Sequence, residues 1–273
     1  MIIDIHTHVF PDALAPKALE VLTHNANVPP LTDGTCSGLL DSMRRSGVDM
    51  SCLMPIATRP NQSRSINQWV SEACGDREAL IPFGSFHPAQ ENWREEIDFI
   101  VEVGLAGVKF HPDYQEFFVD EERMFPIYRA LEEAGLIVLF HAGVDIGLPP
   151  PVHCPPDRLA RVLDEVPNLT IIAAHMGGYF CWDDVERYLV GRNIYFDTSY
   201  SLADLGPERM TDLMKAHGTE KILFGTDSAW TDQADEVASI QSLSLSEAEI
   251  AAVLGENAFR LLGISKTLPS TEK

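Results

Sequence analysis

The chain begins Met1-Ile2-Ile3-Asp4-Ile5-His6-Thr7-His8, an apolar run that ends in two histidines one residue apart. Such a run is typical of a buried β-strand, in which residues i and i+2 project to the same side. His6 and His8 are therefore expected to project together, and a neighbouring imidazole pair can hold one divalent metal ion. The alternative is two polar residues that merely close a strand, but polar residues end later strands as well.

Seven more short apolar runs follow, with stretches of helical spacing between them. The predicted strands span residues 2–7, 50–56, 80–86, 106–110, 136–140, 169–174, 194–198 and 221–225. Short, continuously apolar runs are typical of parallel strands that are buried on both faces. Eight alternating units without an intervening linker predict an α/β fold, a single (β/α)8 TIM barrel over residues 1–264. An open doubly wound sheet is the alternative, and it does not explain where the histidines lie.

Several segments outside this repeat are also interpretable. Ser246-Glu247-Ala248-Glu249 is a capping box that predicts an extra C-terminal helix to about Leu262, packed across the outside of the barrel. Residues 265–273 form a polar tail that is expected to fray. The long segments Pro11–Ser37 and Val144–Pro156 follow the first and fifth strands, and we expect them to be loops that shape substrate access.

Composition limits the classes of partner. The net charge of −21 argues against binding to nucleic acid or to an anionic membrane surface. The sequence has no apolar run long enough to span a bilayer, and it begins without the basic region of a secretory signal. Five scattered cysteines fit reduced thiols better than a disulfide framework. We therefore expect a cytoplasmic protein that acts on a small-molecule substrate, and homo-oligomerisation is left open.

Most of the histidines lie where predicted strands end. Six of the nine are at or just past these ends: His6, His8, His87, His111, His141 and His175. In a barrel the carboxyl ends of the strands meet on one face, where active sites form. Asp227 ends the eighth strand, beside the first, and its carboxylate can ligate a metal or take a proton from bound water. Its alternative role is an N-cap or a local turn.

These residues carry a family resemblance. His6-x-His8, His141, His175 and Asp227 resemble the amidohydrolase superfamily, and the chain is most similar to the "amidohydrolase 2" proteins, which include the aminocarboxymuconate semialdehyde decarboxylase-like enzymes. Gly107-Val108-Lys109-Phe110-His111-Pro112 and Ala174-His175-Met176-Gly177-Gly178 also resemble that subgroup. The resemblance implies that His6, His8 and His141 bind metal and that Asp227 is a further ligand and proton acceptor. It implies that His175 is a second-site ligand or a group that polarises the substrate.

Three residues near this set are candidates for a second metal or for substrate binding. Lys109 and His111 share a side of the fourth strand. Some superfamily members carry a carboxylated lysine there that bridges two metals. We expect instead an uncarboxylated Lys109 paired with a carboxylate, Asp4 or Asp197, and a single metal. Arg59 follows the second strand, where it would clamp a substrate carboxylate or lie in solvent.

The leading functional hypothesis is a metal-dependent hydrolase of the amidohydrolase type. The ion would lower the pKa of bound water to about 7, and Asp227 would act as general base and then as general acid. The alternative is decarboxylation of an aromatic or muconate-like acid at the same site, with Asp227 or His175 controlling protonation of the carbon. A barrel that only binds a metal or a ligand is a third reading. Zinc is the first choice of divalent ion, and the same ligands accept manganese, iron or cobalt, with a second ion left open.

Overall fold

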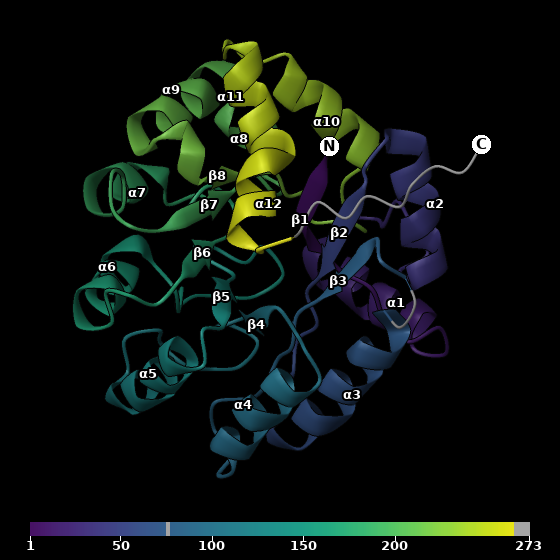
Figure 1. Ribbon diagram of the computed structural model, residues 1–273, viewed down its shortest axis with the longest axis vertical. Coiled ribbons are helices and arrows are strands. Elements are labelled where there is room, and N and C mark those ends of the chain that lie inside the picture. The colour runs from purple at the N-terminus through teal and green to yellow at the C-terminus, as the bar shows by residue number, and fades with distance from the viewer. Residues whose placement is uncertain (75–76, 265–273) are drawn as a thin grey trace.

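The computed structural model describes residues 1–74 and 77–264, with helices around a central group of parallel strands (Figure 1). The predicted tail at 265–273 lies outside the described residues. All eight predicted strands are present: β1 (Ile3–Thr7), β2 (Met50–Leu53), β3 (Leu80–Pro82), β4 (Gly107–Phe110), β5 (Ile137–Phe140), β6 (Ile171–Ala173), β7 (Tyr195–Asp197) and β8 (Ile222–Leu223).

The helices alternate with these strands, as the parallel α/β architecture requires. In chain order they are α1 (Ala15–Ala26), α2 (Cys36–Ser46), α3 (Ser63–Cys74), α4 (Trp93–Glu102), α5 (Phe125–Glu133), α6 (Pro156–Glu165), α7 (Trp182–Tyr188), α8 (Leu202–Leu205), α9 (Pro207–His217), α10 (Gln233–Gln241), α11 (Glu247–Ala251) and α12 (Asn257–Leu261). Helix α1 lies within the segment 11–37, so the expectation of a loop there is wrong. Pro16 at the first turn suits a helix start, since its missing N–H costs nothing there.

The eight strands are parallel and follow one another in sequence order, as the predicted α/β fold requires, and their ladders fall into two groups, β1-β2-β3 and β4 to β8. The first boundary lies between β3 and β4, where the Ala106 N–H donates to the Pro82 carbonyl at 2.9 Å and the Lys109 N–H donates to the Gly84 carbonyl at 2.8 Å. The second follows β8, which has only two residues. Isolated parallel bridges connect the two groups, one between Gly84 after β3 and Val108 of β4, and one between Thr7 of β1 and Ser228 after β8.

The order of side chains along β1 changes at its end. Ile5 belongs to an inner apolar cluster with Leu139 and Leu223, while Asp4 faces outward and accepts a hydrogen bond from Gln233 of α10. Strict alternation would send His6 outward with Asp4, yet His6 faces inward. The pairing of β1 with β2 shifts register between Asp4 and Thr7, and such an irregularity re-aims a side chain. It turns the first histidine toward the interior.

The C-terminal helix lies elsewhere than predicted. The capping box at Ser246 is present, and α11 continues through a π-helical turn (Ala252–Glu256) into α12. Ala258 belongs to the inner apolar cluster, and the Asn257 amide donates to the carbonyls of Thr219 and Ile222 at the start of β8. The helix therefore covers the amino ends of the strands and not the outside of the fold. It shields from water the apolar side chains of the inner cluster, which the short strands do not cover at that end.

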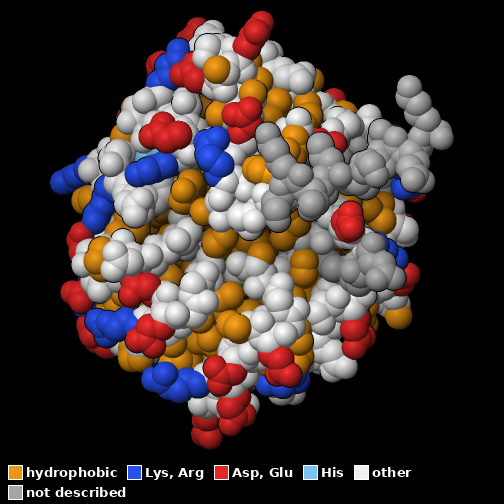
Figure 2. All heavy atoms as spheres, in the orientation of Figure 1, with side chains coloured by type: hydrophobic (Ala, Val, Ile, Leu, Met, Phe, Trp, Pro, Cys, Tyr) orange, Lys and Arg blue, Asp and Glu red, His pale blue; other side chains and the backbone are white. Residues whose placement is uncertain are grey.

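The surface agrees with the acidic composition. Figure 2 shows charged side chains toward the edge of the face that carries α12, with apolar side chains nearer its centre. No helix within residues 1–74 and 77–264 is both long and apolar enough to cross a bilayer.

Candidate metal centre

Three predicted residues meet where β1 and β8 end. His6 Nε2 and His8 Nε2 lie 3.1 Å apart, and Asp227 Oδ1 is 3.1 Å from His8 Nε2 and 3.6 Å from His6 Nε2. Ligands at about 2.1 Å from one ion and roughly at right angles lie about 3 Å from each other. The spacing of these three donor atoms therefore suits one divalent ion.

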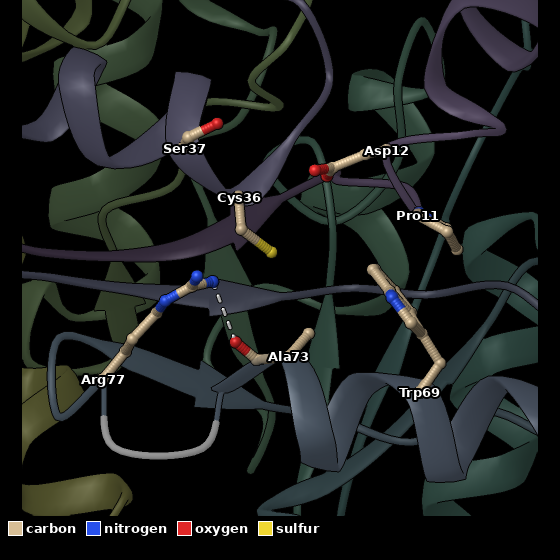
Figure 3. A pocket seen from close by; sticks show the side chains of 7 residues that line it. All are labelled: Pro11, Asp12, Cys36, Ser37, Trp69, Ala73 and Arg77. Atoms are coloured by element: carbon tan, nitrogen blue, oxygen red, sulfur yellow. Dashed lines mark hydrogen bonds between the residues drawn. The ribbon is translucent and has the colours of Figure 1, made fainter.

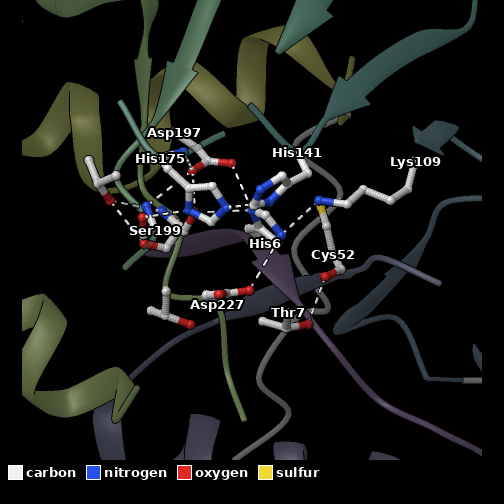
Figure 4. A network of polar contacts seen from close by, with 12 residues as sticks. His6, Thr7, Cys52, Lys109, His141, His175, Asp197, Ser199 and Asp227 are labelled. Carbon is white, nitrogen blue, oxygen red and sulfur yellow. Dashed lines mark hydrogen bonds and ion pairs between the residues drawn. The ribbon is translucent and has the colours of Figure 1, made fainter. Parts of the chain in front are cut away.

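Asp197 at the end of β7 fixes the orientation and protonation of His6 (Figure 4). Its buried carboxylate accepts a hydrogen bond from His6 Nδ1 at 2.9 Å. With the proton on Nδ1, the lone pair of the neutral ring is on Nε2, which points toward His8 and Asp227. Burial, followed by the nearby Lys109 charge, lowers the pKa of His6 to about 4. Burial opposes ionisation of Asp197 as well, but His6 and Ser199 outweigh it and lower its pKa to about 2.

His175 and His141 form a second ordered pair beside this trio. His175 Nδ1 lies 3.0 Å from the Ser199 carbonyl, which only accepts, so Nδ1 carries the proton. His175 Nε2 then accepts from His141 Nδ1 at 3.0 Å. That leaves the lone pair of His141 on Nε2, a buried atom without a hydrogen-bond partner in the described structure. A buried unsatisfied nitrogen in a donor-rich site is consistent with a ligand that accepts electron density.

Backbone strain concentrates around these residues. His175, Met176 and Asp227 have φ values of 59°, 53° and 66°, in the left-handed region that residues with a side chain seldom adopt. The His175 N–H donates to Asp197 Oδ1 at 3.0 Å, which holds the strained turn. Such strain is tolerated where the surrounding contacts over-determine the conformation, commonly at functional sites.

Lys109 has a different partner from the one expected. Its buried Nζ lies 2.9 Å from His6 Nε2, and no ion pair within 4 Å links it to a carboxylate in residues 1–74 and 77–264. Asp4 is unavailable because it faces outward, where it accepts from Thr226 Oγ1 at 2.6 Å. Burial lowers the pKa of Lys109 to about 8 despite the nearby Asp197 and Asp227. The amine therefore loses its proton more readily than an exposed lysine does.

The other two candidates for a second metal or for substrate binding, His111 and Arg59, lie in different places. His111 lies in the site, with its Nε2 3.1 Å from Asp145 Oδ2. Arg59 is exposed at the start of the turn after β2, so the solvent reading of this arginine describes it better than the clamp. Sequence reasoning did not select Asp145 or Ser199. Both lie within five residues of a strand end, and a search of those positions for carboxylates and hydroxyls would have found them.

A surface pocket of about 400 Å³ shares no residue with this centre (Figure 3). It is lined by Pro11, Asp12, Cys36, Ser37, Trp69, Ala73 and Arg77. The Arg77 guanidinium donates to the Ala73 carbonyl at 3.0 Å. The chemistry-bearing residues at the strand ends are therefore distinct from this pocket.

Comparison with known proteins identifies the family of the chain and structures with a similar fold. A family model described as "Amidohydrolase" matches residues 3–264. The structure is similar to 5-carboxyvanillate decarboxylase from Sphingomonas paucimobilis, with 16% identity, a TM-score of 0.73 and coverage of 97% of this chain and 99% of that one. It is also similar to 2,6-dihydroxybenzoate decarboxylase from Rhizobium, with 18% identity, a TM-score of 0.71 and coverage of 96% and 98%.

A third similar structure is 5-carboxyvanillate decarboxylase from Novosphingobium aromaticivorans complexed with manganese and 4-hydroxy-3-methoxy-5-nitrobenzoic acid. It has 15% identity and a TM-score of 0.74, and the match covers 97% of this chain and 96% of that one. At these identities the likeness establishes the fold. No curated protein matches the sequence.

Proposed function

The chain belongs to the amidohydrolase family, and on this premise we propose that it is a metal-dependent decarboxylase of a small aromatic or muconate-like carboxylic acid. The observation that carries the proposal is the convergence of His6, His8 and Asp227 beside His175. That arrangement offers an ion site and proton-transfer groups in one place. The three similar structures whose names specify decarboxylases span nearly the whole chain, which supports this choice over hydrolysis.

The residues have separate roles in the proposal. His6, His8 and Asp227 would hold the ion, which when bound supplies a Lewis acid that neutralises and orients the substrate carboxylate. His141, predicted as a further ligand of this ion, lies beside them. Asp197 keeps the His6 lone pair directed at the ion by holding the proton on Nδ1. Lys109 is proposed to remain an uncarboxylated amine.

Loss of carbon dioxide leaves an electron pair on the substrate carbon, which must take up a proton. Burial disfavours the charge on Asp227, but the hydrogen bond with His8 and the electrostatic interactions with the neighbouring imidazoles outweigh it and hold the pKa of Asp227 well below its usual range. Asp227 is therefore ionised at neutral pH and accepts a proton from the substrate or from water. It or His175 then returns a proton to the carbon.

Hydrolysis is the second candidate, since the same ionised Asp227 would accept a proton from a metal-activated water. The two reactions differ in their products. Purified protein loaded separately with Mn²⁺ and Zn²⁺ is incubated with a panel of hydroxylated benzoic acids in water enriched in ¹⁸O. The proposal predicts carbon dioxide release, one solvent proton on the product carbon and no ¹⁸O in the aromatic product. Incorporation of ¹⁸O into a product of ester, amide or lactone cleavage, without carbon dioxide, would establish hydrolysis instead.

The role of Asp227 is tested with Asp227→Asn. The variant should retain its metal through the two histidines and lose turnover by about 10²- to 10⁴-fold, the usual contribution of a general acid–base group. Asp98→Asn is the matched control, because Asp98 is exposed on α4. Near-normal turnover in Asp227→Asn would remove Asp227 from the mechanism.

A further inference from the structure

A chain of buried polar side chains runs from α10 to the outward face of β1. Gln233 and Glu236 are three residues apart on α10, so their side chains lie next to each other on one side of the helix. The side chain of Gln233 is fully buried, and its amide donates to Asp4 Oδ2 at 2.7 Å. Asp4 belongs to β1 and precedes the proposed metal ligand His6 by two residues.

The Asp4 carboxylate joins the two strand ends that carry His6 and Asp227. Its Oδ1 accepts from the His6 N–H and from the Thr226 N–H, both at 3.1 Å. Its Oδ2 accepts from the Thr226 hydroxyl at 2.6 Å and from the Gln233 amide. Thr226 directly precedes Asp227, whose N–H donates to the His6 carbonyl at 2.9 Å. Asp4 therefore fixes how the backbones of these two ligands lie relative to each other.

Two buried oxygen atoms on α10 have no hydrogen-bond partner within residues 1–74 and 77–264. They are Gln233 Oε1 and Glu236 Oε2. Both are acceptors when Glu236 is ionised, and buried polar atoms are seldom left unpaired. One proton on Glu236 Oε2 would satisfy both atoms, because the acid O–H could then donate to the Gln233 amide oxygen. That bond would hold the amide with its NH₂ group toward Asp4.

The surroundings of Glu236 favour that proton. The charged groups that act on it are Asp4 of β1 and Asp235 of α10, and both are acids. Helix α2 packs against α10, but its charged residues are exposed. The buried residues of α2 are Cys36, Leu39, Ser42 and Met43. Burial, followed by the charge of Asp4, raises the pKa of Glu236 to about 7. Asp4 accepts hydrogen bonds at both of its oxygens, so Glu236 is the donor of the two acids.

We propose that Gln233 and Glu236 are positioning residues for the metal centre, acting through Asp4 on His6 and Asp227 without touching the ion. This role rests on the ion site of the proposed function. The Glu236 acid holds the Gln233 amide, the amide holds the Asp4 carboxylate, and the carboxylate holds the two ligand backbones. Removing one link loosens the separation of the two ligands, and the ion then binds more weakly although every ligand is present.

The test compares Mn²⁺ affinities of the full-length protein at about pH 6, where Glu236 is mostly protonated. Gln233→Leu removes the donor to Asp4 and should weaken binding about tenfold. Glu236→Leu leaves the Gln233 oxygen unpaired and should weaken binding by about 3- to 10-fold. Glu236→Gln supplies an NH₂ donor in place of the acid O–H and should keep wild-type affinity. Glu102→Leu, at an exposed position of α4, is the matched control and should also keep it.

Two readouts separate positioning from a general loss of stability. Electron paramagnetic resonance at saturating Mn²⁺ reports the ligand geometry, and its fine structure should change in Gln233→Leu and Glu236→Leu but not in Glu236→Gln. The ratio of wild-type affinity to Glu236→Gln affinity cancels the protonation of the shared ligands. It should be near one at about pH 6 and fall as the pH rises through 7, because only the wild type loses its donor.

Folded Gln233→Leu protein with wild-type affinity and an unchanged spectrum would overturn the positioning role and leave the metal centre in place. Equal losses of affinity in Glu236→Gln and Glu236→Leu would overturn it as well. The pH comparison needs only wild type and Glu236→Gln, so it decides the question if both leucine variants are unfolded, and a constant ratio would count against the role. Wild-type protein that binds no Mn²⁺ would instead overturn the metal centre itself. The two failures are therefore distinct results.

Discussion

Replacing Asp197 with asparagine should weaken metal binding without touching a proposed ligand. Oδ1 of Asp197 accepts from three donors: the His175 N–H, the Ser199 N–H and the Ser199 hydroxyl. Only Oδ2 faces His6 Nδ1. In Asp197→Asn the amide oxygen must keep the three donors, so the NH₂ group faces His6. Nδ1 then has to accept, and the proton moves to Nε2, where the ion would bind.

The expected loss of metal affinity follows from the hydrogen bond between His6 Nδ1 and Asp197 Oδ2, which the substitution removes. A hydrogen bond to a charged group contributes about 1.5–3 kcal/mol, and each 1.4 kcal/mol is tenfold in binding. Metal affinity should therefore fall by about 10- to 100-fold, which is also the usual effect of removing such an orienting partner. Competition with a chelator of known affinity measures the change, and ¹⁵N chemical shifts of His6 report which nitrogen carries the proton.

Asp98→Asn, on an exposed face of α4, removes one carboxylate and should leave affinity unchanged. Circular dichroism establishes that Asp197→Asn is folded before titration. A folded Asp197→Asn protein with wild-type affinity, or with the His6 proton still on Nδ1, would refute the reasoning.

Three other predictions follow from separate parts of the molecule. Burial, followed by the charge of the nearby Asp4, raises the pKa of Glu236 from 4.5 to about 7. The folded state therefore binds this proton more tightly than the unfolded state does. The contribution of the protonated side chain to folding stability is fully present below pH 4.5 and is lost as the pH rises through 7. Relative to wild type, Glu236→Gln should gain about 2–3 kcal/mol in unfolding free energy between pH 4 and pH 8 in urea titrations, and exposed Glu102→Gln should not. Gly143→Ala should cost about 3 kcal/mol or more, because its Cβ would overlap the Tyr179 backbone at a φ of 83°, whereas Gly191→Ala, with open space around it at a φ of 78°, should cost about 1–2 kcal/mol. Chelation should abolish turnover and lower the thermal midpoint by about 5–10 °C, and saturating Mn²⁺ should restore both; an unchanged midpoint would count against a bound ion in the purified protein.

The strand positions were predictable because short apolar runs between helical stretches leave few other assignments. The direction of His6 was not, since the register shift after Asp4 has no glycine or proline to mark it, and strict alternation placed Asp4 with His6. That error also produced the wrong partner for Lys109. Helix α1 was missed because Pro11 and the polar residues around it resemble a loop when no contacts are known. The position of α12 depends on tertiary contacts of Ala258 that no local pattern reports.

At the site, the sequence identified residues that stand at strand ends, because all such ends meet in this architecture. It did not identify the residues that orient them. Asp197 was considered only as a partner for Lys109, and its contact with His6 depends on the inward turn of β1. Asp145 is positioned by a loop conformation, fixed in part by the Gly147 N–H, that residue types alone do not specify.

The C-terminal helix has a consequence for how the chain is made. The inner apolar cluster joins residues of β1 with Ala258 of α12, which a ribosome makes much later. Until α12 emerges, the apolar side chains at the amino ends of the strands remain open to water and to other nascent chains. Premature termination before α11 would therefore release nearly the whole fold in a form prone to aggregation, and holding chaperones would be needed for longest at this end of the molecule.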